Sequence, residues 1–151
     1  MKLVKVVSGG QTGADTAGLE VAKELGLETG GYCPARWRTE DGSNPKLAEY
    51  GLVCTVEYGY WTRTQLNAQH SRATVWFGTT TSRGYQTTLE ACALYGREMA
   101  VNPTPEKLRA MAETYEVINC AGNRASINPS AAYQTKTTFR QALKVSDESP
   151  T

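Results

Sequence analysis

Residues near the N-terminus have the types and spacing that bind an anion. They follow an apolar run, Leu3–Val7, and precede a stretch of helical periodicity, Ala14–Gly26. A strand, a glycine-rich turn and a helix in this order leave free backbone N–H groups at a helix N-terminus, a geometry that binds phosphate. The predicted ligand-binding residues of this first glycine loop are Ser8, Gly9, Gly10, Gln11, Thr12, Gly13 and Asp15.

The first glycine loop differs from the two commonest phosphate loops. No Lys follows Gly13, as a Walker loop requires. The glycine spacing is not G-x-G-x-x-G, and residues 30–34, the next strand candidate, lack the acid of a dinucleotide fold. The alternative is a tight turn that binds nothing. Hydrogen-bonding side chains at Ser8, Gln11 and Thr12 favour a ligand over that alternative.

A second glycine loop, 78–87, also follows an apolar stretch and opens a helical one. Its hydroxyl groups can bond phosphate or ribose, Arg83 can bind a phosphate bidentately, and Tyr85 can stack on a base. The predicted binding residues of this loop are Thr79, Thr80, Arg83, Gly84, Tyr85, Gln86 and Thr87. The alternative is that the Ser and Thr residues only cap the helix.

Two carboxylates near these loops have two interpretations each. Glu90 follows Thr87 by three residues, so it either faces the site as a general acid/base or ribose acceptor, or is a solvated helix carboxylate. Asp15 lies in the first turn of its helix, where the helix dipole stabilises a carboxylate. It either contacts a ligand or holds the glycine turn in shape.

The long polar connection at 34–45 adds charged and aromatic residues, and a loop of this length is usually functional or disordered. Trp37 and Arg38 suit stacking and charge contacts with a nucleotide. Glu40 and Asp41 either bind a sugar, clamp the arginines or form a plain surface turn.

Composition and charge exclude several classes of protein. The 151 residues suit one domain, predicted over 1–145, followed by a polar tail at 146–151 that we expect to be disordered. Lys plus Arg number 16 and Asp plus Glu 15, so the formal net charge is +1, which gives no support to nucleic-acid binding. No apolar run approaches the roughly 20 residues of a membrane span, and no signal peptide is recognisable.

The cysteine and histidine content gives no sign of a metal site. The four cysteines form no C-x-x-C pair, and His70, the single histidine, lies at no metal-ligand spacing from them. We therefore expect small, buried, reduced cysteines, as in a cytoplasmic protein, and no metal.

Apolar and helical stretches alternate along the whole chain, which predicts an α/β domain with a mostly parallel sheet flanked by helices. Strands are expected at Leu3–Val7, Gly31–Cys33, Leu52–Val56, Ala73–Phe77, Glu98–Val101 and Glu116–Cys120. Helices are expected at Ala14–Gly26, Thr62–Ser71, Tyr85–Tyr95, Pro105–Glu113 and Pro129–Val145, with a single helical turn at Lys46–Tyr50.

Ligands of a parallel sheet bind outside the carboxyl ends of its strands. Four loops with unusual polar residues follow strand candidates, at 8–13, 34–42, 78–84 and 121–126. We therefore expect these loops to converge on one ligand site. Arg63, on the helix after the third strand candidate, and Arg124, after the last one, are further predicted ligand contacts.

With these residues, the chain resembles the putative molybdenum carrier family, a branch of the SLOG (Lonely Guy-like) Rossmann superfamily. The matching motifs are Ser8–Asp15, Gly31–Pro34, Arg38–Gly42, Arg63-Thr64 with Asn67 and Ser71, and Asn119–Gly122 with Arg124 and Ser126. The resemblance implies a Rossmann-like (SLOG) domain whose glycine loops hold a phosphate-bearing ligand, in a protein that forms dimers or larger homo-oligomers. SLOG domains as a group resemble sensors of nucleotide-derived ligands, including those related to NAD and ADP-ribose.

The second glycine loop is also similar to the P-G-G-x-G-T-x-x-E motif of the Lonely Guy enzymes, which cleave the base from a nucleoside monophosphate. Gly84, Thr87 and Glu90 match that motif. Ser82, Arg83 and Gln86 depart from it, which suggests a pocket of different shape.

Three hypotheses follow. The first is non-catalytic binding of a phosphorylated nucleotide-like small molecule, such as a nucleotide, an ADP-ribose-type signal or the molybdenum cofactor, in order to carry, sense or sequester it. The second is a nucleotide N-glycosidase that uses Glu90 as its catalytic carboxylate. The third is an assembly module whose pocket binds nothing.

Overall fold

The computed structural model describes residues 1–144, so the predicted tail at 146–151 lies outside the described residues. A six-stranded sheet with the order β5-β2-β1-β8-β6-β7 is parallel at every pairing. Its strands are β1 (Lys5–Val7), β2 (Glu28–Cys33), β5 (Leu52–Cys54), β6 (Ala73–Phe77), β7 (Glu98–Val101) and β8 (Val117–Gly122). The predicted α/β fold with a parallel sheet is confirmed.

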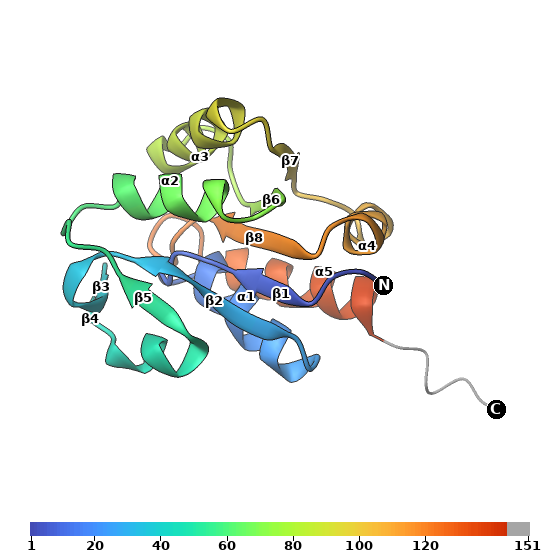
Figure 1. The fold of residues 1–151 in the computed structure, drawn as a ribbon, viewed down its shortest axis with the longest axis horizontal. Coiled ribbons are helices and arrows are strands. Elements are labelled where there is room, and N and C mark those ends of the chain that lie inside the picture. The colour runs from blue at the N-terminus through green and yellow to red at the C-terminus, as the bar shows by residue number, and fades with distance from the viewer. Residues whose placement is uncertain (145–151) are drawn as a thin grey trace.

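Helices cover both faces of the sheet (Figure 1). They are α1 (Ala14–Glu24), α2 (Trp61–Gln69), α3 (Arg83–Leu94), α4 (Pro105–Thr114) and α5 (Ala131–Leu143). Helices α1, α4 and α5 pack together on one face, and α2 packs on α3 on the other. The right-handed crossover rule explains this division. The crossovers through α1 (from β1 to β2) and α4 (from β7 to β8) lead to a strand nearer β5. The crossovers through α2 (from β5 to β6) and α3 (from β6 to β7) lead in the other direction, toward β7, so the two sets of helices lie on opposite faces.

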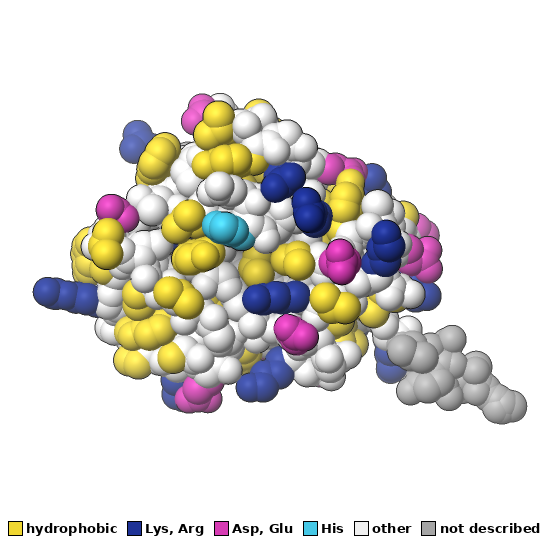
Figure 2. Space-filling model, viewed as in Figure 1, with side chains coloured by type: hydrophobic (Ala, Val, Ile, Leu, Met, Phe, Trp, Pro, Cys, Tyr) yellow, Lys and Arg dark blue, Asp and Glu magenta, His cyan; other side chains and the backbone are white. Residues whose placement is uncertain are grey.

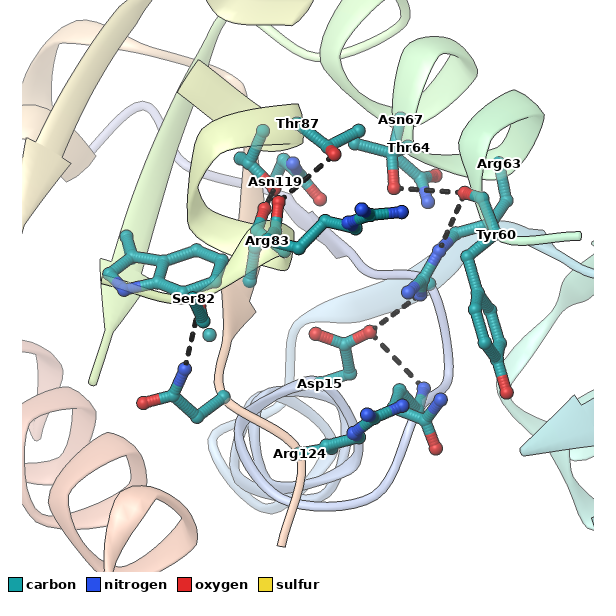
Figure 3. A pocket seen from close by; sticks show the side chains of 18 of the residues that line it. Asp15, Tyr60, Arg63, Thr64, Asn67, Ser82, Arg83, Thr87, Asn119 and Arg124 are labelled. Atoms are coloured by element: carbon teal, nitrogen blue, oxygen red, sulfur yellow. Dashed lines mark hydrogen bonds and ion pairs between the residues drawn. The ribbon is translucent and has the colours of Figure 1, made fainter. Parts of the chain in front are cut away.

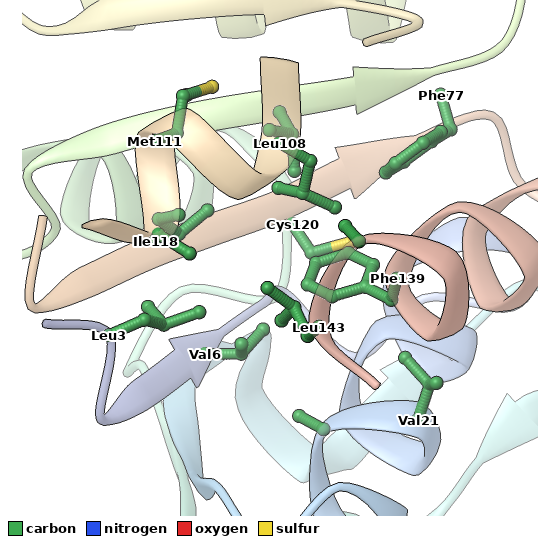
Figure 4. Close-up of a cluster of buried hydrophobic side chains, with 14 of the residues drawn as sticks. Leu3, Val6, Val21, Phe77, Leu108, Met111, Ile118, Cys120, Phe139 and Leu143 are labelled. Atoms are coloured by element: carbon green, nitrogen blue, oxygen red, sulfur yellow. The ribbon is translucent and has the colours of Figure 1, made fainter. Parts of the chain in front are cut away.

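The larger core lies between the sheet and the face made by α1, α4 and α5. Val6 and Ile118 from the sheet meet Leu108 and Phe139 from the helices, all fully buried (Figure 4). Helix α1 lies so close to β8 that a Cβ at Gly18 would stand 2.6 Å from the Sγ of Cys120. A smaller cluster of Ala68, Ala91 and Cys92 fills the space under α2 and α3.

The connection predicted as a structureless loop at 34–45 contains short elements. It holds a 3-10 turn, η1 (Ala35–Trp37), and a hairpin of β3 (Arg38–Thr39) and β4 (Gly42–Ser43). A second 3-10 helix, η2 (Pro45–Tyr50), replaces the expected single helical turn. Leu47 of η2 packs on Leu19, Cys33 and Leu52, so these apolar contacts hold the connection against the sheet edge.

Several predicted bounds shift by a few residues. Strand β2 begins at Glu28 rather than Gly31, because Glu28 and Thr29 pair with β1. Helix α3 begins at Arg83 rather than Tyr85, because the Oγ of Ser82 accepts the Tyr85 N–H at 3.2 Å and caps the helix there. Within residues 1–144, none of the helices combines the length and the apolar character that crossing a bilayer requires.

Acidic and basic side chains are interspersed over the face seen in Figure 2, as the near-neutral composition leads one to expect. His70 lies exposed on this face, and its ring stands 5.5 Å from the ring of Tyr32. The four cysteines are free thiols, and three of them are buried. No group of three or more His, Cys, Asp or Glu side chains is placed to hold a metal ion in the part of the chain that the structure describes.

Candidate functional site

The four loops expected to converge do so at the carboxyl edge of the sheet. The hydroxyl of Thr12 in the first glycine loop accepts the N–H of Ala125 at 3.1 Å and donates to Glu40. The Oδ1 of Asn123 accepts the N–H of Thr79 at 2.6 Å, and the carbonyl of Asn123 accepts the N–H of Ala14. Loops far apart in the sequence are therefore tied into one edge by hydrogen bonds.

A pocket of about 430 Å³ opens at this edge, between α2, α3 and the ends of β6 and β8 (Figure 3). It is large enough for a ligand of nucleotide size. Eight of the residues predicted from the sequence to bind a ligand line it: Gly9, Gln11, Asp15, Arg63, Arg83, Gly84, Thr87 and Arg124. The other predicted residues lie behind the pocket wall or outside it: Ser8, Gly10, Thr12, Gly13, Arg38, Glu40, Asp41, Thr79, Thr80, Tyr85, Gln86 and Glu90.

Three N–H groups of the first glycine loop are already engaged within the protein. The N–H of Gly10 donates to the Oγ of Ser8 at 3.2 Å, and that of Thr12 donates to the Oε1 of Gln11 at 3.0 Å. The N–H of Gln11 donates to the Oδ2 of Asp15 at 3.1 Å. The anion inside this turn is thus a carboxylate of the chain itself. This corrects the expectation that these N–H groups wait for a ligand phosphate.

The side chain of Arg63 covers the same loop. Its Nη1 lies 2.9 Å from the Oδ2 of Asp15, and a Cβ added at Gly9 would stand 1.7 Å from that nitrogen. A side chain at position 9 would therefore displace the guanidinium of Arg63, which occupies that space. The first glycine loop holds an internal ion pair, which lies between its backbone and the pocket.

Asp15 is almost fully buried, with 4% of its surface exposed. Burial raises the pKa of its carboxyl above the ordinary value, and Arg63 and the N–H of Gln11 oppose this by favouring the charged form. Of the two interpretations of Asp15, the structure shows the second directly, since its carboxylate holds the turn in shape.

The second glycine loop presents a different surface to the pocket. The first bond inside α3 runs from the Gln86 N–H to the Ser82 carbonyl, so the N–H groups of Arg83 and Gly84 precede the intrahelical ladder. The side chain of Arg83 extends into the pocket toward α2 (Figure 3). Its guanidinium forms no ion pair with any carboxylate of residues 1–144. A cation and a helix N-terminus therefore face the same space.

Glu40 ties the hairpin to the loop after β8 and positions Arg124. Its carboxylate accepts the N–H of Ser126 at 3.1 Å, the hydroxyls of Ser126 and Thr12, and lies 3.5 Å from the Nε of Arg124. Burial raises the pKa of Glu40, but the hydrogen bonds from Ser126 and Thr12 outweigh this, and the pKa lies below its ordinary value. Of the roles considered for Glu40, clamping an arginine matches these contacts.

Arg38 and Asp41 lie away from the pocket. The guanidinium of Arg38 stacks on the rings of Tyr58 and Tyr60, 4.3 and 4.6 Å from their centres, and donates to the carbonyl of Tyr58. Asp41 is exposed at the turn between β3 and β4. The hairpin therefore braces the loop 55–60 instead of reaching a ligand with its charges.

Tyr85 and Gln86 of the second loop, and Glu90 after it, also lie outside the pocket lining. The ring of Tyr85 packs edge-on against Trp76 at 5.4 Å between ring centres. The amide of Gln86 donates to the carboxylate of Glu90 at 2.9 Å, and both side chains are exposed on α3. Glu90 is thus the solvated helix carboxylate of the two interpretations, one turn too far along α3 to line the pocket.

Sequence reasoning missed several residues of the pocket wall. Tyr60, Trp61 and Thr64, at the start of α2, line it beside Arg63. Their position in the sequence could have indicated this, because they lie at the start of the helix that follows β5, and that start lies at the carboxyl edge of the sheet. Asn67, which belongs to the motif shared with the family, clamps the backbone of Tyr32 through both its amide atoms.

Comparison with known proteins agrees with this architecture. A crystal structure of a putative molybdenum carrier protein from Syntrophus aciditrophicus SB matches with a TM-score of 0.83 and 25% sequence identity, over 94% of this chain and 96% of that one. No curated protein matches. The model of the circularly permutated YpsA SLOG family matches residues 6–143. The chain therefore belongs to the circularly permutated YpsA SLOG family.

Proposed function

We propose that the protein binds a phosphorylated, nucleotide-like small molecule and carries, senses or sequesters it without changing it chemically. The observation that carries the proposal is Arg83, a cation without a carboxylate partner among residues 1–144, beside the first N–H groups of α3 in a pocket of about 430 Å³. An anion at this place gains a guanidinium and a helix N-terminus together.

The charge of the pocket supports an anionic ligand. Its lining includes three guanidinium groups, of Arg63, Arg83 and Arg124, and one carboxylate, of Asp15. Arg63 and Asp15 neutralise each other across 2.9 Å. Arg124 is paired with Glu40, whose carboxylate lies 3.5 Å from its Nε. This leaves Arg83 as the pocket arginine without a carboxylate partner in the described chain. A guanidinium near a helix N-terminus suits a phosphate better than a neutral ligand.

Hydrolysis of an N-glycosidic bond receives less support. Such a reaction needs a free carboxylate at the sugar, and Glu90, the predicted candidate, is exposed on α3 and bonded to Gln86. Asp15, the carboxylate that does line the pocket, is held by Arg63 and by the N–H of Gln11. These contacts favour binding over catalysis.

The ligand candidates are a nucleotide, an ADP-ribose-type signal and the pterin phosphate of the molybdenum cofactor. The last is included because the similar solved structure is described as a putative molybdenum carrier protein. The residues that line the pocket include nitrogen and hydroxyl donors, which suit a phosphate group. Recognition of such a cofactor here would therefore use its phosphate and its ring rather than a bond to the metal.

Thermal unfolding with a small panel of compounds tests the proposal. The panel contains AMP, ADP-ribose, inorganic phosphate and, as the uncharged control, adenosine. A ligand present at 100 times its Kd adds about 2.7 kcal/mol, which for a chain of this size raises Tm by roughly 5–10 °C. We expect phosphorylated compounds to raise Tm, adenosine to leave it unchanged, and mass spectrometry to recover each compound intact. Equal shifts with adenosine and AMP, or release of free adenine, would contradict the proposal.

A further inference from the structure

The walls of the pocket include aromatic side chains, and two of them are already occupied by partners within the protein. The ring of Tyr60 faces the guanidinium of Arg38 at 4.6 Å and that of Arg63 at 5.2 Å. Trp76 is 2% exposed, and its ring is covered by the edge of Tyr85. Both rings therefore already pack against partners within the protein.

Trp61 differs from both. It lines the same pocket, and 64% of its surface is exposed. Within residues 1–144 its indole stacks on no other ring and lies under no cation. Exposing an indole to water at the mouth of a polar pocket is unfavourable, and covering it with a flat apolar surface regains that free energy.

The position of Trp61 on α2 aims it at the ligand space. Thr64 and Asn67 follow it at intervals of three residues, and all three line the pocket, so one face of α2 forms this wall. Helix α2 packs beside α3, whose first residue is Arg83 (Figure 1). The side chain of Arg83 extends from α3 toward α2 (Figure 3). A phosphate at Arg83 and a ring at Trp61 thus share one pocket.

The geometry points to Trp61 as the residue that stacks on a flat heterocyclic ring of the ligand, so that the pocket selects nucleotides and pterin phosphates over sugar phosphates. This inference rests on the proposed function and adds a flat ring as the part of the ligand that raises its affinity above that of a sugar phosphate. It also replaces the two stacking residues expected from the sequence. Tyr85 is engaged with Trp76, and Trp37 packs against the apolar cluster under η2.

Binding of AMP and of ribose 5-phosphate to Trp61→Ala, measured by isothermal titration calorimetry, tests the inference. Loss of one base-stacking contact weakens binding by about five- to a hundredfold. We expect Trp61→Ala to weaken AMP binding within that range and to leave ribose 5-phosphate binding unchanged. Trp61→Phe, which keeps a ring, should restore most of the affinity for AMP. Tyr133→Ala, which removes an aromatic side chain 76% exposed on α5, is the matched control and should bind both compounds as the wild type does.

The outcomes separate this inference from the proposed function. If the wild type binds ribose 5-phosphate as tightly as AMP, or if Trp61→Ala weakens both compounds equally, the stacking role is wrong although the anion site stands. If neither compound binds the wild type, the proposed function fails and the inference fails with it. Intrinsic fluorescence gives an independent readout, since AMP should quench the wild type, and the quench should disappear in Trp61→Phe.

Discussion

At the scale of single residues, two carboxylates shape the site without being free to react. Glu40 accepts hydrogen bonds from two loops distant in the sequence, whereas Asp15 accepts the N–H of Gln11 in its own loop. Each carboxylate lies beside an arginine of the pocket. Their role is to fix Arg63 and Arg124 in place. The pocket therefore depends on two carboxylates that hold its arginines in place, although their residue type alone suggests catalytic acids.

Replacing Asp15 by Ala leaves the mostly buried guanidinium of Arg63 without its carboxylate partner. Breaking one side of a buried ion pair costs about 3–5 kcal/mol, and the exposed fractions of the two side chains are 14% for Arg63 and 6% for Asp15. We expect Asp15→Ala to lower the free energy of unfolding by about that amount in urea titrations. Glu24→Ala, which breaks an exposed ion pair with Arg140, is the control and should change stability far less. Equal losses of unfolding free energy in the two variants would show that the buried Asp15–Arg63 pair stabilises the fold no more than the exposed Glu24–Arg140 pair does.

The lowered pKa of Glu40 predicts how stability depends on pH. Its ordinary value is 4.5, and the folded protein holds it lower. Its hydrogen bonds therefore stabilise the fold fully above about pH 4.5, and this stabilisation is lost as the pH falls through the folded pKa. We expect Glu40→Gln to be about 1 kcal/mol less stable than the wild type at pH 7. The difference in unfolding free energy should narrow as the pH falls below 4.5; a difference that stays constant on acidification would contradict the role assigned to Glu40.

At the scale of elements, the order of strands and helices could be predicted from the sequence because apolar runs alternate with helical periods. Strands β6 and β7 begin and end at the predicted residues. The predicted strand bounds were wrong where polar residues take part in the sheet, as at Glu28 of β2, which pairs with Lys5. A single polar residue carries no local signal for such pairing, since it arises from contact with a distant strand.

The approach of α1 to β8 gives a prediction at this scale. In an open helix, replacing Gly by Ala gains roughly 0.5–1 kcal/mol. At Gly18 a Cβ would stand 2.6 Å from the Sγ of Cys120, so crowding should outweigh that gain. We expect Gly18→Ala to destabilise the protein by about 1–3 kcal/mol in thermal or urea unfolding.

Gly59→Ala serves as the control for Gly18→Ala. No atom lies within 4 Å of a Cβ at Gly59, so its stability should stay near that of the wild type. A stabilised Gly18→Ala variant would mean that α1 lies farther from the sheet than the structure has it.

At the scale of the whole molecule, the parallel sheet gathers the site. The first and second glycine loops follow β1 and β6, which are separated by one strand, β8, although about seventy residues lie between them in the sequence. The convergence could be predicted from the rule that ligands bind at the carboxyl ends of parallel strands. Which loop groups face a ligand and which bond to other groups of the protein could not be predicted. The N–H of Gln11 donates to Asp15 of the same loop, and Arg63 reaches that carboxylate from α2, contacts for which the sequence carries no local signal. Homo-oligomer formation, which the resemblance implied, stays a prediction.

The affinity of ADP-ribose for Arg83→Ala, measured by isothermal titration calorimetry beside the wild type, tests the central claim most directly. The control is Arg72→Ala, which removes the same charge from an exposed position. Arg72 lies just before β6, at the amino ends of the strands and so at the opposite end of the sheet from the pocket. Charge-assisted hydrogen bonds are worth about 1.5–3 kcal/mol, so Arg83→Ala should weaken binding by roughly ten- to a hundredfold while Arg72→Ala binds as the wild type does. Equal affinity in Arg83→Ala and Arg72→Ala would contradict an anion site at the start of α3.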